Sequence, residues 1–161
     1  KPLAIVLRAM YEEASQTATQ DAVDRLRIPI PQQGQQLSAL LSNLDQHSQD
    51  IQGTTLKRIR TQIVDGMAQG SSAKEIGTAI NQIIADPARA DMIAITETNA
   101  SYNAAAHDTY VAADLQQWEW VAYDGACVEC LDQEGLHDIS DTDLPPLHPN
   151  CRCAVVPVVE Q

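Results

Sequence analysis

Residues 127–153, CVECLDQEGLHDISDTDLPPLHPNCRC, hold every cysteine of the chain and two of its four histidines. The side chains able to bind a metal form two groups: the Cys-x-x-Cys pair Cys127 and Cys130, and His148 with the Cys-x-Cys pair Cys151 and Cys153. A tetrahedral zinc ion prefers thiolate and imidazole ligands, and two close pairs around a spacer of about twenty residues are typical of a structural site. The sequence therefore predicts structural zinc.

Five good ligands compete for four positions, and His137 is a weaker sixth. If the end of the stretch is a strand, Cys151 and Cys153 share a face, and a four-cysteine site leaves His148 spare. The other set is Cys127, Cys130, His148 and Cys151, with Cys153 as a buried thiol beside it. Two disulfides or four free thiols are the alternatives to metal. The sequence shows no secretion signal, so we expect reduced cysteines, which favours metal.

Composition predicts a mostly helical protein. The chain has 161 residues, 44% of them hydrophobic, which is enough for one ordinary domain or one domain with an appendage. Aromatic residues make up only 4% and Phe is absent, whereas Ala and Gln are abundant. Helices packed through small side chains fit this composition better than a large sheet does.

Apolar residues recur every three or four positions through most of residues 3–113, which predicts successive helices. The first covers residues 3–27 and ends at a connector, residues 28–34, that contains Pro29 and Pro31. The second covers about 35–51, and Gly53 is predicted to end it. Thr54 or Thr55 then caps a third helix. Its apolar stripe is Leu56, Ile59, Ile63 and Met67.

Two further helix starts carry capping signals. Ser72 and Glu75 fit a capping box, in which hydroxyl and carboxylate satisfy free amides of the first turn. Asp86 and Pro87 fit an N-cap and a first helical residue, and they open the longest helix, residues 87–113.

The pattern changes at Trp118. WEWVAY, residues 118–123, alternates with period two and is bounded by Asp124 and Gly125, which predicts a strand that ends in a turn. A second strand is predicted within CRCAVVPVV, residues 151–159. Trp118 and Trp120 share a face of the first strand. We interpret that face as core, the alternative being an exposed anchor for a partner.

The predicted fold is α+β and mainly α. It has a helical region, residues 1–113, and a small Cys/His module, residues 114–161, with two short strands, packed as one unit with the helix at 87–113. Such a small module has little core of its own, so a metal is expected to hold its shape.

Charge is unevenly placed: residues 112–161 hold ten Asp or Glu and one Arg, within a total net charge of −12. An acidic surface repels phosphate, so we expect a protein partner and no DNA contact by this segment. The alternative is that the negative charge binds no partner and only keeps the protein soluble. No run of 18 apolar residues exists, so no membrane contact is expected. Because Lys1 is not an initiator Met, we expect a processed chain or part of a longer one.

From Arg89 onward the chain resembles the phage Mu F-like minor head proteins, the head morphogenesis family. The resemblance rests on Arg89 with the helix at residues 93–106, on the strand and paired cysteines, and most specifically on PPLHPNCRC, residues 145–153. It implies a structural protein of the virion, in the head interior or at the portal vertex, assembled in the host cytoplasm. The implied partners are portal and other head proteins, with no small-molecule substrate.

The resemblance also gives a role to two residues of the long helix. Arg89 and Glu97 are eight residues apart, about two helical turns, and could pin the cysteine module to the helices. Trp118 and Asp124 complete the predicted structural support. The alternative for Arg89 and Glu97 is a solvated helix surface.

We expect no catalysis, because no His-Glu-x-x-His or deaminase signature is present. Glu129 and His137 stand alone as an acid and an imidazole within the loop, with no nucleophile and base arranged around them. The alternative functions are a zinc-dependent or toxin-like enzyme and a zinc-stapled interaction module.

Overall fold

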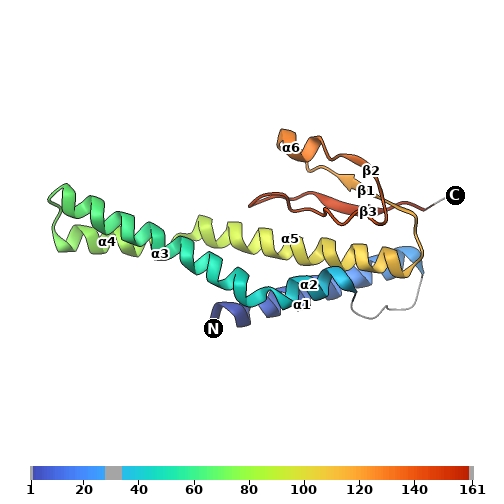
Figure 1. The fold of residues 1–161 in the computed structure, drawn as a ribbon, viewed down its shortest axis with the longest axis horizontal. Helices are drawn as coiled ribbons and strands as arrows, with labels where there is room; N and C mark the ends of the chain where they lie inside the picture. The colour runs from blue at the N-terminus through green and yellow to red at the C-terminus, as the bar shows by residue number, and fades with distance from the viewer. Residues whose placement is uncertain (1, 28–33, 160–161) are drawn as a thin grey trace.

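The computed structural model describes residues 2–27 and 34–159. It is mainly helical with a small antiparallel sheet in its last third, which confirms the predicted fold class (Figure 1). The predicted connector, with Pro29 and Pro31, lies outside the described residues except for Gly34. The elements are α1 (Pro2–Leu26), α2 (Gln35–Ser42), α3 (Leu44–Ala68), α4 (Ala73–Ile84), α5 (Pro87–Ala112), β1 (Gln117–Val121), α6 (Val128–Leu131), β2 (Gly135–Asp138) and β3 (Ala154–Pro157).

The body of the molecule is built on α5, with α1 and α2 on one side and the sheet on the other (Figure 1). Alanines such as Ala18 and Ala22 of α1 and Ala105 and Ala106 of α5 belong to one buried cluster. Because alanine side chains end at Cβ, the two helices approach closely and bury their contact without large side chains. None of the helices in the described ranges has both the length and the apolar character needed to cross a membrane.

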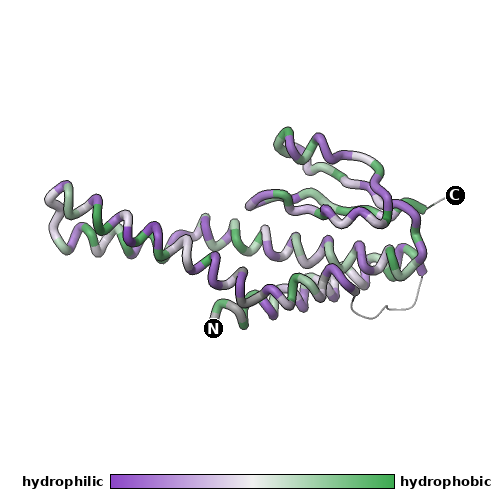
Figure 2. Tube along the Cα trace, in the orientation of Figure 1, coloured by the Kyte–Doolittle hydropathy of each residue, from purple (hydrophilic) through white to green (hydrophobic). Residues whose placement is uncertain are grey.

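The hairpin of α3 and α4 extends beyond the body as an arm, residues 54–84 (Figures 1 and 2). Gly66 is buried where the two helices meet, and a Cβ there would lie 2.7 Å from Cγ1 of Ile76. Two helices bury only their mutual interface, so the predicted apolar stripe of α3 is largely uncovered. Leu56 and Met67 are 54% and 70% exposed.

The predicted helix boundary at Gly53 is wrong. The break falls at Asn43, and α3 runs through Gly53. Thr54 and Thr55 do not cap a helix, because their hydroxyls donate within α3 to the carbonyls of Asp50 and Ile51, at 2.9 and 3.2 Å. One glycine disfavours a helix by only about 1 kcal/mol relative to alanine, which the surrounding turns of a 25-residue helix offset.

Both predicted capping signals are confirmed. Ser72 and Glu75 form a capping box at the start of α4. The Asp86 carboxylate accepts a hydrogen bond from the Arg89 amide at 3.3 Å, and Pro87 is the first residue of α5. These bonds satisfy amides that the first helical turn leaves free.

The sheet has three strands in the order β2-β1-β3, whereas the sequence predicts two. The missed strand, β2, is only four residues long and starts with Gly135, so it carries almost no alternation to detect. Both neighbours run antiparallel to β1, with Trp118 opposite His137 and Trp120 opposite Val155. The turn predicted at Asp124 and Gly125 is present, and Gly125 has the positive φ of 85° that favours glycine.

Trp118 and Trp120 are fully buried, which confirms that this face of β1 is core. They belong to the same cluster as Tyr110 of α5 and the cysteines Cys130, Cys151 and Cys153. The face of the sheet that carries the tryptophans is therefore covered by α5 and the cysteine loops.

Candidate metal centre

Two tight turns present the candidate ligands. Cys127 is the N-cap of α6 and Cys130 lies in its only turn, where the Leu131 amide donates to the Cys127 carbonyl at 3.0 Å. In the second turn the Cys151 amide donates to the His148 carbonyl at 3.2 Å. Asn150 supplies the positive φ of 64° there, which asparagine adopts more readily than most residues. Each turn thus offers two ligands three residues apart.

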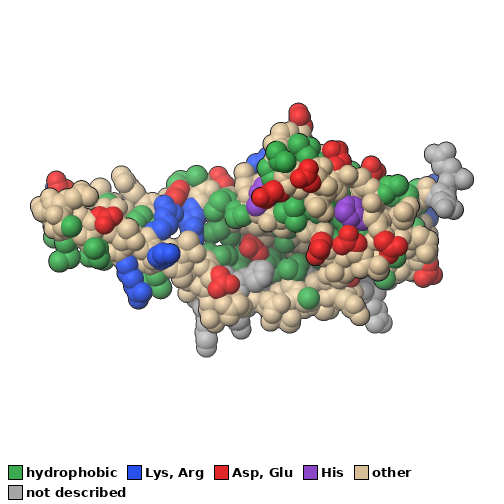
Figure 3. Space-filling model, turned by 45° about the horizontal axis from the view of Figure 1, so that its top comes forward, with side chains coloured by type: hydrophobic (Ala, Val, Ile, Leu, Met, Phe, Trp, Pro, Cys, Tyr) green, Lys and Arg blue, Asp and Glu red, His purple; other side chains and the backbone are tan. Residues whose placement is uncertain are grey.

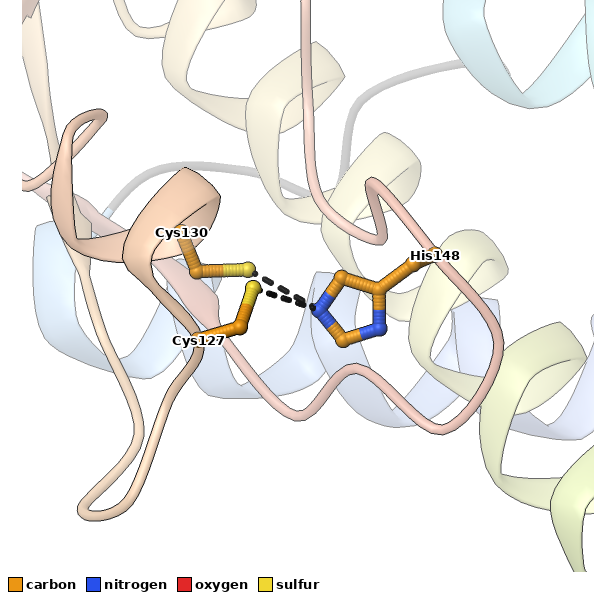
Figure 4. A group of neighbouring side chains, drawn as sticks. All are labelled: Cys127, Cys130 and His148. Carbon is orange, nitrogen blue, oxygen red and sulfur yellow. Dashed lines mark hydrogen bonds between the residues drawn. The ribbon is translucent and has the colours of Figure 1, made fainter.

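The two turns bring their side chains together (Figure 4). Nε2 of His148 lies 3.3 Å from Sγ of Cys127 and 3.2 Å from Sγ of Cys130. Sγ of Cys130 lies 3.8 Å from Sγ of Cys151. Thiol and imidazole donors at these separations could hold a metal ion.

A second group of three cysteines overlaps the first. The sulfurs of Cys130, Cys151 and Cys153 all lie within 4.8 Å of one another, as do the donor atoms of Cys127, Cys130 and His148. Cys130 belongs to both groups. Cys151 and Cys153 are both buried, as expected if alternate residues point inward.

The thiols differ in their environment. Burial raises the pKa of Cys130, whereas the nearby backbone amide of Cys130 lowers the pKa of the exposed Cys127. A buried thiolate is disfavoured without a neighbouring positive charge, and a bound cation supplies that charge. The chemistry of this donor set therefore fits a soft, thiolate-binding metal.

Helix α5 holds the second turn through a stripe of polar side chains. Thr96 Oγ1 accepts from the Asn150 amide at 2.8 Å. Asn99 Nδ2 donates to the carbonyls of Cys151 and Cys153, at 3.2 and 3.0 Å. The ligand-bearing backbone is therefore fixed to a rigid helix.

Asn103 continues this stripe one turn further along. It is fully buried, and its Nδ2 donates to the carbonyls of Pro145 and Cys153, both at 3.2 Å. Its Oδ1 accepts from the Val155 amide at 3.0 Å. One side chain thus joins the Pro-Pro segment, the last cysteine and β3.

His107 and Tyr110 complete the stripe. Nε2 of His107 lies 3.0 Å from the Ile139 carbonyl, and the Tyr110 hydroxyl donates to the Val155 carbonyl at 3.3 Å. Since a carbonyl only accepts, Nε2 of His107 carries the proton. Burial lowers the pKa of His107, so the ring is neutral and acts as a donor to the loop after β2.

Residues 57–156 match the family described as Phage Mu protein F like protein. The chain belongs to this family. No curated protein and no solved structure matches it. The membership confirms the resemblance read from the sequence and supports a phage head protein. The matched part of this Mu F-like chain includes α4, α5, β1, β2 and both ligand-bearing turns.

The hydrogen bonds of Arg89 and Glu97 connect α5 to other helices of this Mu F-like fold. Arg89 donates to the Ile51 carbonyl of α3 at 3.1 Å, and Glu97 accepts from the Tyr11 hydroxyl of α1. The polar stripe supplies hydrogen bonds from α5 to the module. The sequence did carry a sign of these bonds to the module: Thr96, Asn99 and Asn103 are three polar residues on one side of an alanine-rich helix.

His137 belongs to neither ligand group. Its ring stacks on Trp118 with centroids 4.3 Å apart, and its nitrogens lie 2.9 Å from the Asp141 carboxylate and 2.7 Å from the Gln133 carbonyl. It therefore covers the tryptophan face. Asp124, the fourth predicted support residue, is exposed in the turn after β1.

Proposed function

We propose that this protein is a non-enzymatic minor head protein of a tailed phage that acts in head morphogenesis at the portal vertex. Its location is the virion, in the head interior or at the portal vertex, after assembly in the host cytoplasm. The observation that carries the proposal is the family match over residues 57–156. Both ligand-bearing turns lie within that match, and hydrogen bonds from α5 hold the backbone of the second turn. This arrangement favours a structural role over a catalytic one.

We propose structural Zn²⁺ as the metal, held by Cys127, Cys130, His148 and Cys151. Two turns with ligands three residues apart support this set, since each turn contributes two donors from a fixed backbone. With zinc–sulfur bonds of about 2.3 Å, two thiolates of a tetrahedral site stand about 3.8 Å apart. The Cys130 and Cys151 sulfurs have this separation, 3.8 Å.

The role of the metal in this proposal is to cross-link the two turns. Four protein ligands leave no open position for water, unlike a catalytic zinc site. The chain's own residues do the positioning, because Asn99 holds the backbone of Cys151 and Thr96 holds that of Asn150. Glu97 lies in the groove beside His148, and its carboxylate is engaged by the Tyr11 hydroxyl.

Portal and other head proteins are the proposed partners, and no small-molecule substrate is proposed. Acidic side chains are spread over the visible face of the module, which fits a basic protein surface (Figure 3).

DNA contact by this segment is not proposed, because the basic residues of α1 and those of α3 do not form one patch. The charge of Arg25 is near enough to Tyr102 and Tyr110 of α5 to act against the rise in their pKa. Arg58 instead lies 3.4 Å from Asp86, just before the start of α5. At 1.5 Å per helical residue, Asp86 and Tyr102 are about 24 Å apart along α5.

The test is a titration of the purified chain against assembled portal and against duplex DNA at two salt concentrations. We expect tighter binding to portal, with an association rate that falls as salt rises, because salt screens attraction between opposite charges. Strong DNA binding without portal binding would reject the proposal.

A further inference from the structure

One flank of the arm combines uncovered apolar and basic side chains. Leu56, Arg60, Ile63 and Met67 recur at spacings of four, three and four residues along α3, and each is exposed to solvent. This spacing places them in a row on one side of the helix, with Lys57 beside them. We call this row, with Lys57, the α3 stripe. Figure 3 shows basic side chains gathered over this part of the molecule.

The stripe has the pattern of a helix seam that lacks its partner. Positions at alternating spacings of three and four are typical of a surface that packs against another element, and here three of the four are apolar while Arg60 occupies the other. Ile76 of α4 packs instead against the adjoining side of α3, at Gly66. The stripe thus remains free after the hairpin has formed.

The outer face of the sheet has the complementary chemistry. Glu119 lies at its centre, paired with Leu136 on one side and Val156 on the other. Val121 and Leu136 are 40% and 62% exposed, because the tryptophan face alone is covered by α5. Two further exposed acids flank Leu136: Asp138, which alternates with it within β2 and so points to the same side, and Glu134, which lies just before the strand. We call these six residues the outer sheet face.

We propose that the α3 stripe of one copy docks on the outer sheet face of a second copy of this chain. Each surface offers exposed apolar side chains flanked by charge, and the charges are opposite: Lys57 and Arg60 on one, Glu119 and Glu134 on the other. The arm extends away from its own module, so the two surfaces of one chain do not meet (Figure 1).

Charge distinguishes this contact from a symmetric pairing of two arms. Antiparallel pairing of two stripes would bring the two copies of Arg60 close together, because Arg60 lies next to the midpoint of the stripe, and Asp65 lies on the opposite side of α3. Like charges in contact oppose such pairing. The head-to-tail contact is heterologous, so it builds rings or open chains rather than closed dimers. This inference does not depend on the proposed portal partner.

The test is sedimentation velocity of the full chain over a range of concentrations, at about 50 mM and about 500 mM salt. We expect species larger than a dimer at low salt that dissociate at high salt. The double variant Lys57→Glu with Arg60→Glu, and separately Glu119→Lys with Glu134→Lys, should each weaken association at least about tenfold. An equal mixture of the two double variants should restore it, because each contact again joins opposite charges.

Lys74→Glu is the matched control, since it reverses an exposed charge on α4 of the same arm, outside the stripe. It should leave association unchanged, and all variants should keep the native helical circular dichroism. A monomer at every concentration in low salt would overturn the proposal. So would association that the module variant retains and the arm variant loses, which would point to pairing of arms.

Discussion

Nδ1 of His148 lies 2.9 Å from the carbonyl oxygen of Pro149, the residue that follows it. A carbonyl only accepts, so Nδ1 carries the proton and donates it. This hydrogen bond also raises the pKa of His148. The lone pair of neutral His148 is then on Nε2, the atom that faces Cys127 and Cys130. The ring is oriented for metal binding by its own chain, as outer hydrogen bonds orient ligating histidines in metal sites.

The proposed ligand set predicts different metal contents for two buried cysteines. Cys151→Ser should lower zinc from about one equivalent to below about a tenth, because it removes one of four ligands. Cys153→Ser should keep about one equivalent, because its sulfur lies outside the proposed set. Elemental analysis of protein purified under reducing conditions measures both. Loss of zinc in Cys153→Ser, with zinc retained in His148→Gln, would instead identify a four-cysteine site.

Cys130→Ser should loosen the module while the helices persist. Cys130 shares its buried cluster with Trp118 and Trp120, so their fluorescence should shift to the red as water enters. Far-ultraviolet circular dichroism should stay largely helical, because the second cluster, around Leu7 and Tyr11, lies apart from the metal centre. A collapse of the helical signal would show that helices and module unfold as one cooperative unit.

Asn103→Ala should destabilise the metal-loaded protein by about 2–4 kcal/mol, because it leaves two carbonyls and one amide without their buried partner. Urea unfolding measures the change in the free energy of unfolding. Gln82→Ala, on an exposed position of α4, is the control and should change stability by less than about 0.5 kcal/mol. Equal effects of the two variants would remove the structural role given to Asn103.

His137 should make stability fall as pH rises above neutral. Burial disfavours its charged ring, but hydrogen bonds to Gln133 and Asp141 outweigh burial and raise the pKa of His137. Its contribution is therefore complete below the unfolded pKa of about 6.5 and is lost as pH rises through the folded value.

The measurement is the difference in unfolding free energy between the native chain and His137→Gln, followed upward from about pH 6.5. His107, whose pKa burial lowers, is present in both proteins, so its contribution cancels in this difference. A difference that stays constant with pH would contradict the charged state of His137.

The sequence alone determined the features that depend on neighbours along the chain. The capping box of Ser72 and Glu75, the helix start at Asp86, the turn at Gly125 and the alternation that buries Trp118 were all predictable. Each rests on a side chain that acts within a few residues of its own backbone. The paired spacing of the cysteines likewise predicted a metal site before any contact was known.

Tertiary structure alone decided which groups meet. The sequence left five ligands open, and packing placed Cys130 between His148 and Cys151. It also gave Asn103 its partners some fifty residues away, and it completed the sheet with a strand too short to carry a pattern. An apolar stripe in the sequence indicates that a helix face is suited to burial. Whether that face is covered depends on where the other helices and strands lie. The stripe of α3 remains uncovered because the arm extends beyond the body.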